Sequence, residues 1–462
     1  MLRTGPDGRL AAGMIAGGIG LDVALRSGLA SAAATAFIAI AAAALLLGGR
    51  VQGPTARLVI GAAPVLGLLE TVRSSPWVVI PVAAAAGLLL TLGASLGADR
   101  GRLRATFPAL LTRLGLAAGQ VAAAPGILRP RNPHGGGTLA WHKALATGRG
   151  ILLGGPVLLI VGLLLASADP IFRSWFDLPA ILQHAVFIAM GAWLVAGLAR
   201  TASAAQAVPG LRSSPMLGTL EASVVLGGLC CLYGAFVGAQ FVALSGAGHR
   251  ILVTHGLTYA QYARDGFFNL LWCAAITLVV LLGVRGCSGA CNRLLIALSL
   301  LTIALTLGVV VVAIRRLALY EAAFGLTMLR LACLVAAVWI GVVFLMLAAS
   351  VLAHGLLSRW FPAAMLISAL VLIAAWGAVN PAAIVASTGI QRAEHGQQLD
   401  VRQAAGLGPD AIPALLASLP DLPAGQAASL RAAVCAEVPA GHAGTRFNLD
   451  RLRASDAITR AC

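Results

Sequence analysis

Long apolar runs are the feature that most limits what this chain can fold into. A helix needs about 20 apolar residues to cross the hydrocarbon core of a bilayer, with a range of about 17 to 25. The chain holds eleven runs of roughly this length. They lie near residues 9–25, 28–48, 56–70, 76–97, 150–168, 179–200, 217–245, 266–284, 291–314, 325–353 and 361–379. The pattern predicts a protein with about eleven membrane crossings, of which the first and third are short.

The composition favours a membrane protein over a soluble one. Of the 462 residues, 59% are hydrophobic and 10% are charged, whereas soluble domains carry about 25% charged residues. The formal charge is +16, but the basic residues fall between the apolar runs, as membrane topology requires, and do not form a nucleic-acid interface. The weak alternation of a membrane barrel is also missing. We therefore expect an all-α fold, a polytopic transmembrane helical bundle whose partner is the lipid bilayer and not nucleic acid.

The distribution of basic residues predicts which way the chain is oriented. Residues 98–149 contain eight basic residues and one acid, Asp99, so the positive-inside rule assigns this loop to the cytoplasm, where it would contact anionic lipid headgroups. Counting crossings from this loop leaves 17 basic residues inside and 8 outside before residue 380. We expect a bacterial plasma (inner) membrane protein with a cytoplasmic N-terminus and an extracytoplasmic tail.

These boundaries divide the chain into four parts. We expect N-terminal transmembrane helices at 1–97, the basic cytoplasmic loop at 98–149, the main transmembrane bundle at 150–379 and a small soluble helical tail at 380–462. The first residues lack the long apolar region of a cleavable signal peptide, so the first helices are expected to remain in the mature protein.

The tail differs from the rest of the chain in composition. Its seven arginines balance seven acids, and it contains two short predicted helices, from Pro409 and near 426–437. Such a module has little apolar mass for a core of its own, so we expect it to dock on the outer face of the bundle. Cys435 and Cys462 would lie in an oxidising compartment, where they can form a disulfide.

A polar stretch, THGLTYAQYARDGFFNLL at 254–271, precedes one of the apolar runs. In a helix Tyr259 and Tyr262 share one face, while Arg264 and Asp265 lie on another. The stretch is typical of an amphipathic segment at the membrane interface, followed by a turn at Gly266. One interpretation is an aromatic belt that anchors the helix. The other is a polar site, because anchoring alone does not require Arg264 and Asp265.

A second polar stretch, YEAAFGLTMLRL at 320–331, is predicted on the same outer side. It places Tyr320 and Glu321 before a glycine and Arg330 inside the next apolar run, from which its side chain can reach the headgroups. Asp22 is a further ionisable residue on that side. We expect these groups to converge with the first stretch, and Glu321 or Asp265 to pair with an arginine; the alternative is that they only fix helix register.

Five short motifs resemble those of a bacterial multi-pass membrane family that is known only as a domain of unknown function. They are TYAQYARDGFF at 258–268, YEAAFGLTMLR at 320–330, NPAAIVA at 380–386, LGPDAIPALL at 407–416 and FNLDR at 447–451. The resemblance runs from about Asp22 to the C-terminus. This chain departs from the family pattern at Gln261, where relatives carry Glu, and at Phe324, where they carry Tyr. The resemblance implies an architecture and no established activity.

Three classes of function fit these observations. Catalysis is disfavoured because the chain lacks the HExxH, Gly-x-Ser-x-Gly and Asp-rich motifs, and we expect no metal and no cofactor. A small-molecule or ion transporter needs polar groups in mid-membrane, and the candidates Glu221, His184 and Gln240 are isolated. For the same lack of catalytic motifs, an enzyme that modifies lipids is the least favoured of the three classes. We therefore expect a non-enzymatic signalling or envelope-associated membrane protein with an outward-facing polar site and protein partners that the sequence does not identify.

Overall fold

The computed structural model describes a helical membrane protein. It covers residues 6–48, 51–98, 107–122, 124, 180–203, 218–242, 259–287, 293–353, 356–437 and 443–462. Within these ranges the secondary structure is helical without strands, and nine helices are long and apolar enough to cross a membrane. The second predicted crossing forms the shorter apolar helix α2, Ala32–Leu47. The fifth, at 150–168, lies outside the described residues, so the structure does not confirm a count of eleven.

Contacts divide the chain into two compact units. The first contains residues 1–103, 111–208 and 439–453, and the second contains 104–110, 209–438 and 454–462. This division differs from the four predicted parts, because helix α8 and a short piece of the tail pack with the N-terminal helices. Most of the predicted cytoplasmic loop lies outside the described residues, which include from it only residue 98 at the end of α4, helix α5 (Phe107–Ala122) and residue 124.

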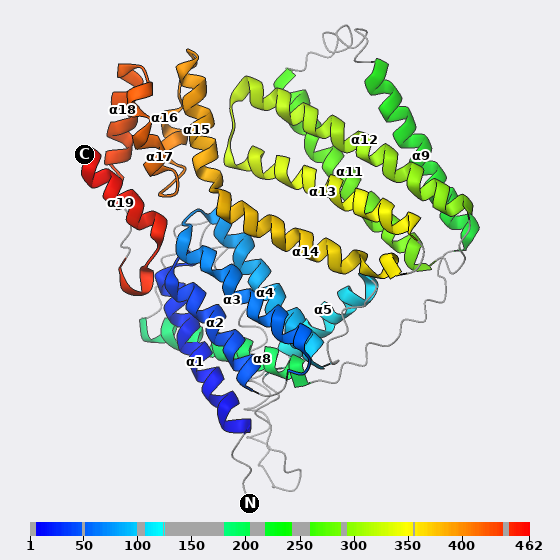
Figure 1. Ribbon diagram of the computed structural model, residues 1–462, viewed down its shortest axis with the longest axis horizontal. Helices are drawn as coiled ribbons and strands as arrows, with labels where there is room; N and C mark the ends of the chain where they lie inside the picture. The colour runs from blue at the N-terminus through cyan, green and yellow to red at the C-terminus, as the bar shows by residue number, and fades with distance from the viewer. Residues whose placement is uncertain are drawn as a thin grey trace, which may run out of the picture. The chain divides into compact units, whose positions relative to one another are not determined.

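The first unit is a bundle in which α1 (Pro6–Ser27) packs on α2 and α8 (Ala180–Ser203), and α3 (Pro54–Val72) packs on α2 and α4 (Pro76–Ala98). The dark blue and light blue helices of Figure 1 belong to this unit. Glycine allows α1 and α8 to approach closely, since a Cβ added at Gly191 would lie 2.5 Å from the Gly17 carbonyl oxygen.

Helices α2 and α3 form a hairpin whose open end is marked by polar contacts. Ser31 caps the start of α2 by accepting a hydrogen bond from the Ala34 amide. The Thr35 hydroxyl lies 2.8 Å from that of Thr71, near the end of α3. At the opposite end, the Gln52 amide donates to the Gly97 carbonyl of α4. The α1–α2 and α3–α4 turns therefore lie at one end of the unit, and the α2–α3 turn lies at the other.

The membrane helices of the second unit are α9 (Thr219–Val242), α11 (Tyr259–Cys287), α12 (Arg293–Phe324), α13 (Met328–Leu352) and α14 (Leu356–Val379). Helix α12 packs against α9, α11 and α13 (Figure 1). Apolar residues from these helices, such as Leu226, Ile303 and Phe344, are fully buried between them. Large apolar side chains such as Trp272, 66% exposed, cover the outside, which suits contact with lipid.

The predicted turn at Gly266 is wrong. Helix α11 begins at Tyr259 and continues through Gly266, so the polar stretch is the first part of a long helix. A Cβ at this position would meet only the end of the flexible Arg316 side chain from α12, which can move aside. Arg316 also donates to Gln240 of α9 at 3.5 Å. The polar ends of these helices thus contact one another.

The tail folds into short helices around its own core. They are α15 (Pro381–Glu394), α16 (Val401–Ala405), α17 (Ile412–Ala417), α18 (Ala424–Cys435) and α19 (Leu449–Ala461), with 3-10 turns at Leu419–Asp421 and Gly444–Arg446. Asn380, in the left-handed conformation, caps α15 and donates to the Asp410 carbonyl at 2.9 Å. A disulfide joins Cys435 to Cys462.

The tail core is completed by residues of the membrane bundle. Ile412, Leu415 and Leu430 are buried together with Leu326, from the α12–α13 connection, and Met328, the first residue of α13. The small apolar core of the tail thus gains area by packing on the bundle, as its composition predicts.

Candidate functional site

The connection between α12 and α13 is built by the predicted motif at 320–331. Gly325 ends α12 with φ of +78°, and its amide donates to the Glu321 carbonyl at 2.8 Å. Thr327 then caps α13 by accepting a hydrogen bond from the Arg330 amide. The glycine and threonine of the motif therefore specify a tight turn between two membrane helices.

Two arginines bind the last carbonyl oxygens of α12. Arg330 lies over the Tyr320 ring, 4.3 Å from its centroid, and donates to the carbonyls of Phe324 and Gly325. Arg392 of α15 donates to the carbonyls of Glu321 and Ala322, at 3.3 and 2.9 Å. Carbonyls at the end of a helix lack the amides of a following turn and carry the negative end of the helix dipole, so two guanidinium groups stabilise them; the Glu321 carbonyl also accepts the Gly325 amide. Both arginines donate to main-chain oxygens, and among the described residues neither pairs with the Glu321 carboxylate.

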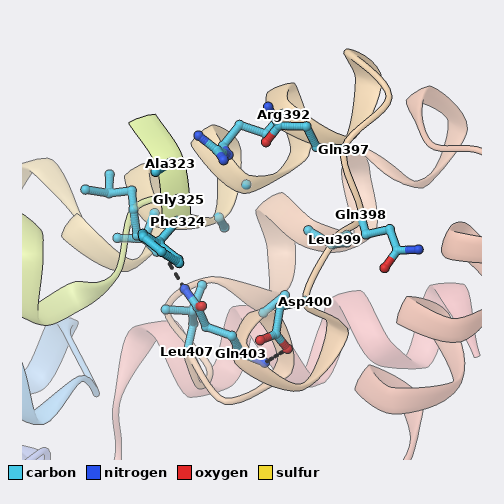
Figure 2. Close-up of a pocket in the computed structure, with 15 residues that line it drawn as sticks. Ala323, Phe324, Gly325, Arg392, Gln397, Gln398, Leu399, Asp400, Gln403 and Leu407 are labelled. Carbon is cyan, nitrogen blue, oxygen red and sulfur yellow. Dashed lines mark hydrogen bonds between the residues drawn. The ribbon is translucent and has the colours of Figure 1, made fainter. Parts of the chain in front are cut away.

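A polar cavity of about 270 Å³ lies between this helix end and the tail. Figure 2 shows Arg392 and Asp400 on opposite sides of it, with Gln403 below the α12–α13 turn. The side-chain amide of Gln403 donates to the Leu326 carbonyl at 3.0 Å. The main-chain amide of Gln403 donates to the Asp400 carboxylate at 2.9 Å. Other lining residues are Ala323, Phe324, Gly325, Val385, Ala386, Gly389, Gln397, Gln398, Leu399, Ala404 and Leu407.

A smaller cavity, of about 160 Å³, connects the two predicted polar stretches. Phe267 and Phe268, from the first stretch, line it together with Tyr320 and Arg330 from the second. The two phenylalanine rings meet edge to face, with centroids 5.3 Å apart. The side chains of Tyr259, Tyr262, Arg264 and Asp265 lie outside the described part of the structure, so their predicted convergence stays a prediction.

Asp22 lies in the first unit and contacts His184. The buried carboxylate of Asp22 is 2.7 Å from His184 Nδ1, and Arg26 also contacts the imidazole. Helices α1 and α8 bring these residues together although they are 162 positions apart. Asp22 thus has a local partner within its own unit.

A buried charge cluster that the sequence analysis did not single out also lies in this unit. Arg73, after the end of α3, pairs with Asp450 of the FNLDR motif at 2.9 Å, and both side chains are at least 90% buried. Asn448 donates to the carbonyls of Glu70 and Arg73 at 3.1 and 2.8 Å. The Ala32 amide donates to the Phe447 carbonyl. The motif therefore attaches a tail segment to the α1–α2 and α3–α4 turns.

The described residues offer polar binding groups more readily than metal ligands. No group of three or more His, Cys, Asp and Glu residues that could hold a metal ion is found among them. The cavity beside Arg392 instead presents a guanidinium, a carboxylate and several amides, which can bind a small molecule with hydroxyl, amide or charged groups.

Comparison with protein-family models identifies the family. Residues 58–418, which are 361 of the 462 residues, match the family described as Domain of unknown function (DUF4153). The chain belongs to the DUF4153 family. The match is shorter at both ends than the motif resemblance. In this DUF4153 protein it includes the α12–α13 turn and the Arg392 cavity, but neither Asp22 nor the FNLDR motif.

Two further comparisons gave no similar protein. No curated protein matches the chain, and no solved structure matches it. The family assignment and the apolar helices establish an integral membrane protein of the DUF4153 family.

Proposed function

We propose that this DUF4153 protein is a non-enzymatic signalling or envelope-associated protein of a bacterial plasma membrane. Its N-terminus and the basic loop at 98–149 would lie in the cytoplasm, with the loop against anionic headgroups, and its tail would lie outside. The cavity beside Arg392 would bind a small polar molecule of the cell envelope.

The single membrane crossing made by α4 supports an extracytoplasmic tail. The basic loop begins where α4 ends, and the α3–α4 turn lies at the other end of that helix. If the loop is cytoplasmic, the turn at 73–75 is extracytoplasmic. The FNLDR motif is bound to that turn through Asn448 and Asp450. The disulfide between Cys435 and Cys462 also favours an oxidising compartment.

The observation that carries the binding proposal is the position of the cavity between a membrane helix and the tail. Arg392 and Gln403 belong to the tail, yet they donate to main-chain oxygens at the end of α12 and in the turn that follows. A molecule in the cavity therefore contacts both parts and can alter how they pack. A volume of about 270 Å³ suits a ligand smaller than a drug-sized molecule, since typical ligand pockets measure about 300 to 1,000 Å³.

Ligand-induced stabilisation tests this proposal. The purified protein in lipid nanodiscs is heated with and without a polar extract of the cell envelope, and the melting temperature is expected to rise with the extract. Replacing Gln397 and Gln398 together by alanine removes two polar lining groups and is expected to abolish most of that rise. The matched control is Gln391→Ala, which changes an exposed glutamine of α15 outside the cavity.

The results distinguish binding from transport. An equal rise for the parent and for the Gln397→Ala, Gln398→Ala variant would contradict the cavity as the binding site. Solute accumulation by proteoliposomes of the parent would favour the transporter alternative. The three candidates for a transport path do not come together: Glu221 is exposed in the first turn of α9, Gln240 lies near the end of the same helix, and His184 pairs with Asp22 in the first unit.

A further inference from the structure

Glu70 is a carboxylic acid buried in a membrane-spanning helix. Glu70 lies near the end of α3 and is 1% exposed. Within the described part of the chain, neither of its carboxylate oxygens has a hydrogen-bond partner. Buried polar groups nearly always have partners, so a carboxyl with two unsatisfied oxygens needs an explanation.

The described helices that pack most on α3 carry no counter-charge for Glu70. Helices α2 and α4, which pack extensively on α3, contain no Asp, Glu, His, Lys or Arg. Among the described residues, the charged groups on the segments that adjoin Glu70 in sequence or bind its main chain are Arg73, Asp450 and Arg453. Arg73 donates to the Asp450 carboxylate, and Arg453 lies 3.4 Å from the same group. Asn448 binds Glu70 only through its main-chain carbonyl.

An ionised carboxylate in this place would be very costly. Moving an unpaired carboxylate from water into an apolar interior costs so much that the group becomes neutral instead. Charged groups in membrane-spanning segments are rare and usually paired or in contact with water. A proton removes the charge without any movement of the surrounding helices.

We propose that Glu70 is a proton-binding site and that it carries its proton, as the neutral acid, in the folded protein at neutral pH. The proposal rests on the burial of Glu70 and is independent of the function proposed for the tail cavity. Release of the proton would create a second carboxylate near Arg73, which already pairs with Asp450. Proton binding at Glu70 therefore favours the arrangement in which the FNLDR motif is bound.

Infrared difference spectroscopy of the full-length protein in nanodiscs tests the proposal. A protonated carboxyl has a carbonyl stretching band that a carboxylate lacks. Glu70→Gln is expected to remove this band at neutral pH while leaving the melting temperature unchanged, because glutamine has nearly the same shape as the neutral acid. The matched control, Glu221→Gln, removes an exposed carboxylate that accepts the Gly218 amide, and is expected to remove a carboxylate band.

Loss of a carboxylate band in Glu70→Gln would overturn the proposal. A hydrophobic carbodiimide gives a second measurement on the unchanged protein, in case this variant does not fold. The reagent takes up the carboxyl proton on nitrogen while the carboxyl oxygen bonds to its central carbon, and the adduct rearranges to a stable acylurea. Peptide mass spectrometry is expected to find the adduct on Glu70 and not on Glu221. An unmodified Glu70 would contradict the proposal.

Discussion

Replacing Arg73 by alanine is expected to destabilise the protein by about 3 kcal/mol or more, because it leaves the buried Asp450 carboxylate without its main partner. The Arg73 and Asp450 side chains are 10% and 5% exposed. Arg453 also contacts Asp450, but at 3.4 Å and with a side chain that is 57% exposed, so it compensates little. Denaturant titration of the purified protein in mild detergent measures the loss.

The control for this prediction is an arginine of α3, and a double-mutant cycle tests the pair. Arg57 is an exposed arginine near the start of α3, and Arg57→Ala is expected to change the free energy of unfolding by less than about 0.5 kcal/mol. Arg73→Ala and Asp450→Asn are expected to be strongly non-additive, since each removes the same interaction. Additive effects, or an Arg73→Ala effect no larger than that of Arg57→Ala, would show that the pair does not hold the tail segment.

Removal of the disulfide is the second large change. The bond between Cys435 and Cys462 joins residues 27 positions apart, and closing a loop of this length stabilises a protein by about 3 to 4 kcal/mol. In the double variant Cys435→Ser, Cys462→Ser the C-terminal part of α19 is no longer linked to α18. We expect the tail to unfold at lower denaturant concentration and to be cleaved faster by protease, at unchanged membrane insertion.

The matched control for this prediction is Cys231→Ser, which replaces an exposed free cysteine of α9. Its stability is expected to equal that of the parent. The parent and the Cys231→Ser variant, but not the Cys435→Ser, Cys462→Ser variant, should migrate differently on oxidising and reducing gels. Identical migration of the parent under both conditions would mean that the two cysteines do not form a disulfide in the cell.

Most of the helices could be predicted because apolar length is a local property of the sequence. Tertiary packing decided what the sequence did not reveal. The turn expected at Gly266 fails because α11 continues past it, and this glycine lies beside the Arg316 side chain of a different helix. A pattern within one segment cannot show which side chain of another segment will lie against it.

Several site residues could be predicted from the sequence, but the residues that bind them from distant segments could not. Tyr320 and Arg330 were found as a motif, and they contact each other. Arg392 was not found, because it lies 71 positions from Glu321 and binds a main-chain oxygen that no sequence pattern marks. Arg73 gave one weak signal, a basic residue between two apolar runs that is predicted on the outer side.

We propose that the tail lies on the extracytoplasmic side of the membrane and the basic loop on the cytoplasmic side, and cysteine labelling tests this most directly. Ser429→Cys, at an exposed tail position, and Thr138→Cys, in the loop at 98–149, are each made with every cysteine except Cys435 and Cys462 replaced by serine. Intact cells are treated with a membrane-impermeant maleimide. We expect labelling of the Ser429→Cys protein, and labelling of the Thr138→Cys protein only after the cells are opened. The reverse pattern would contradict the account.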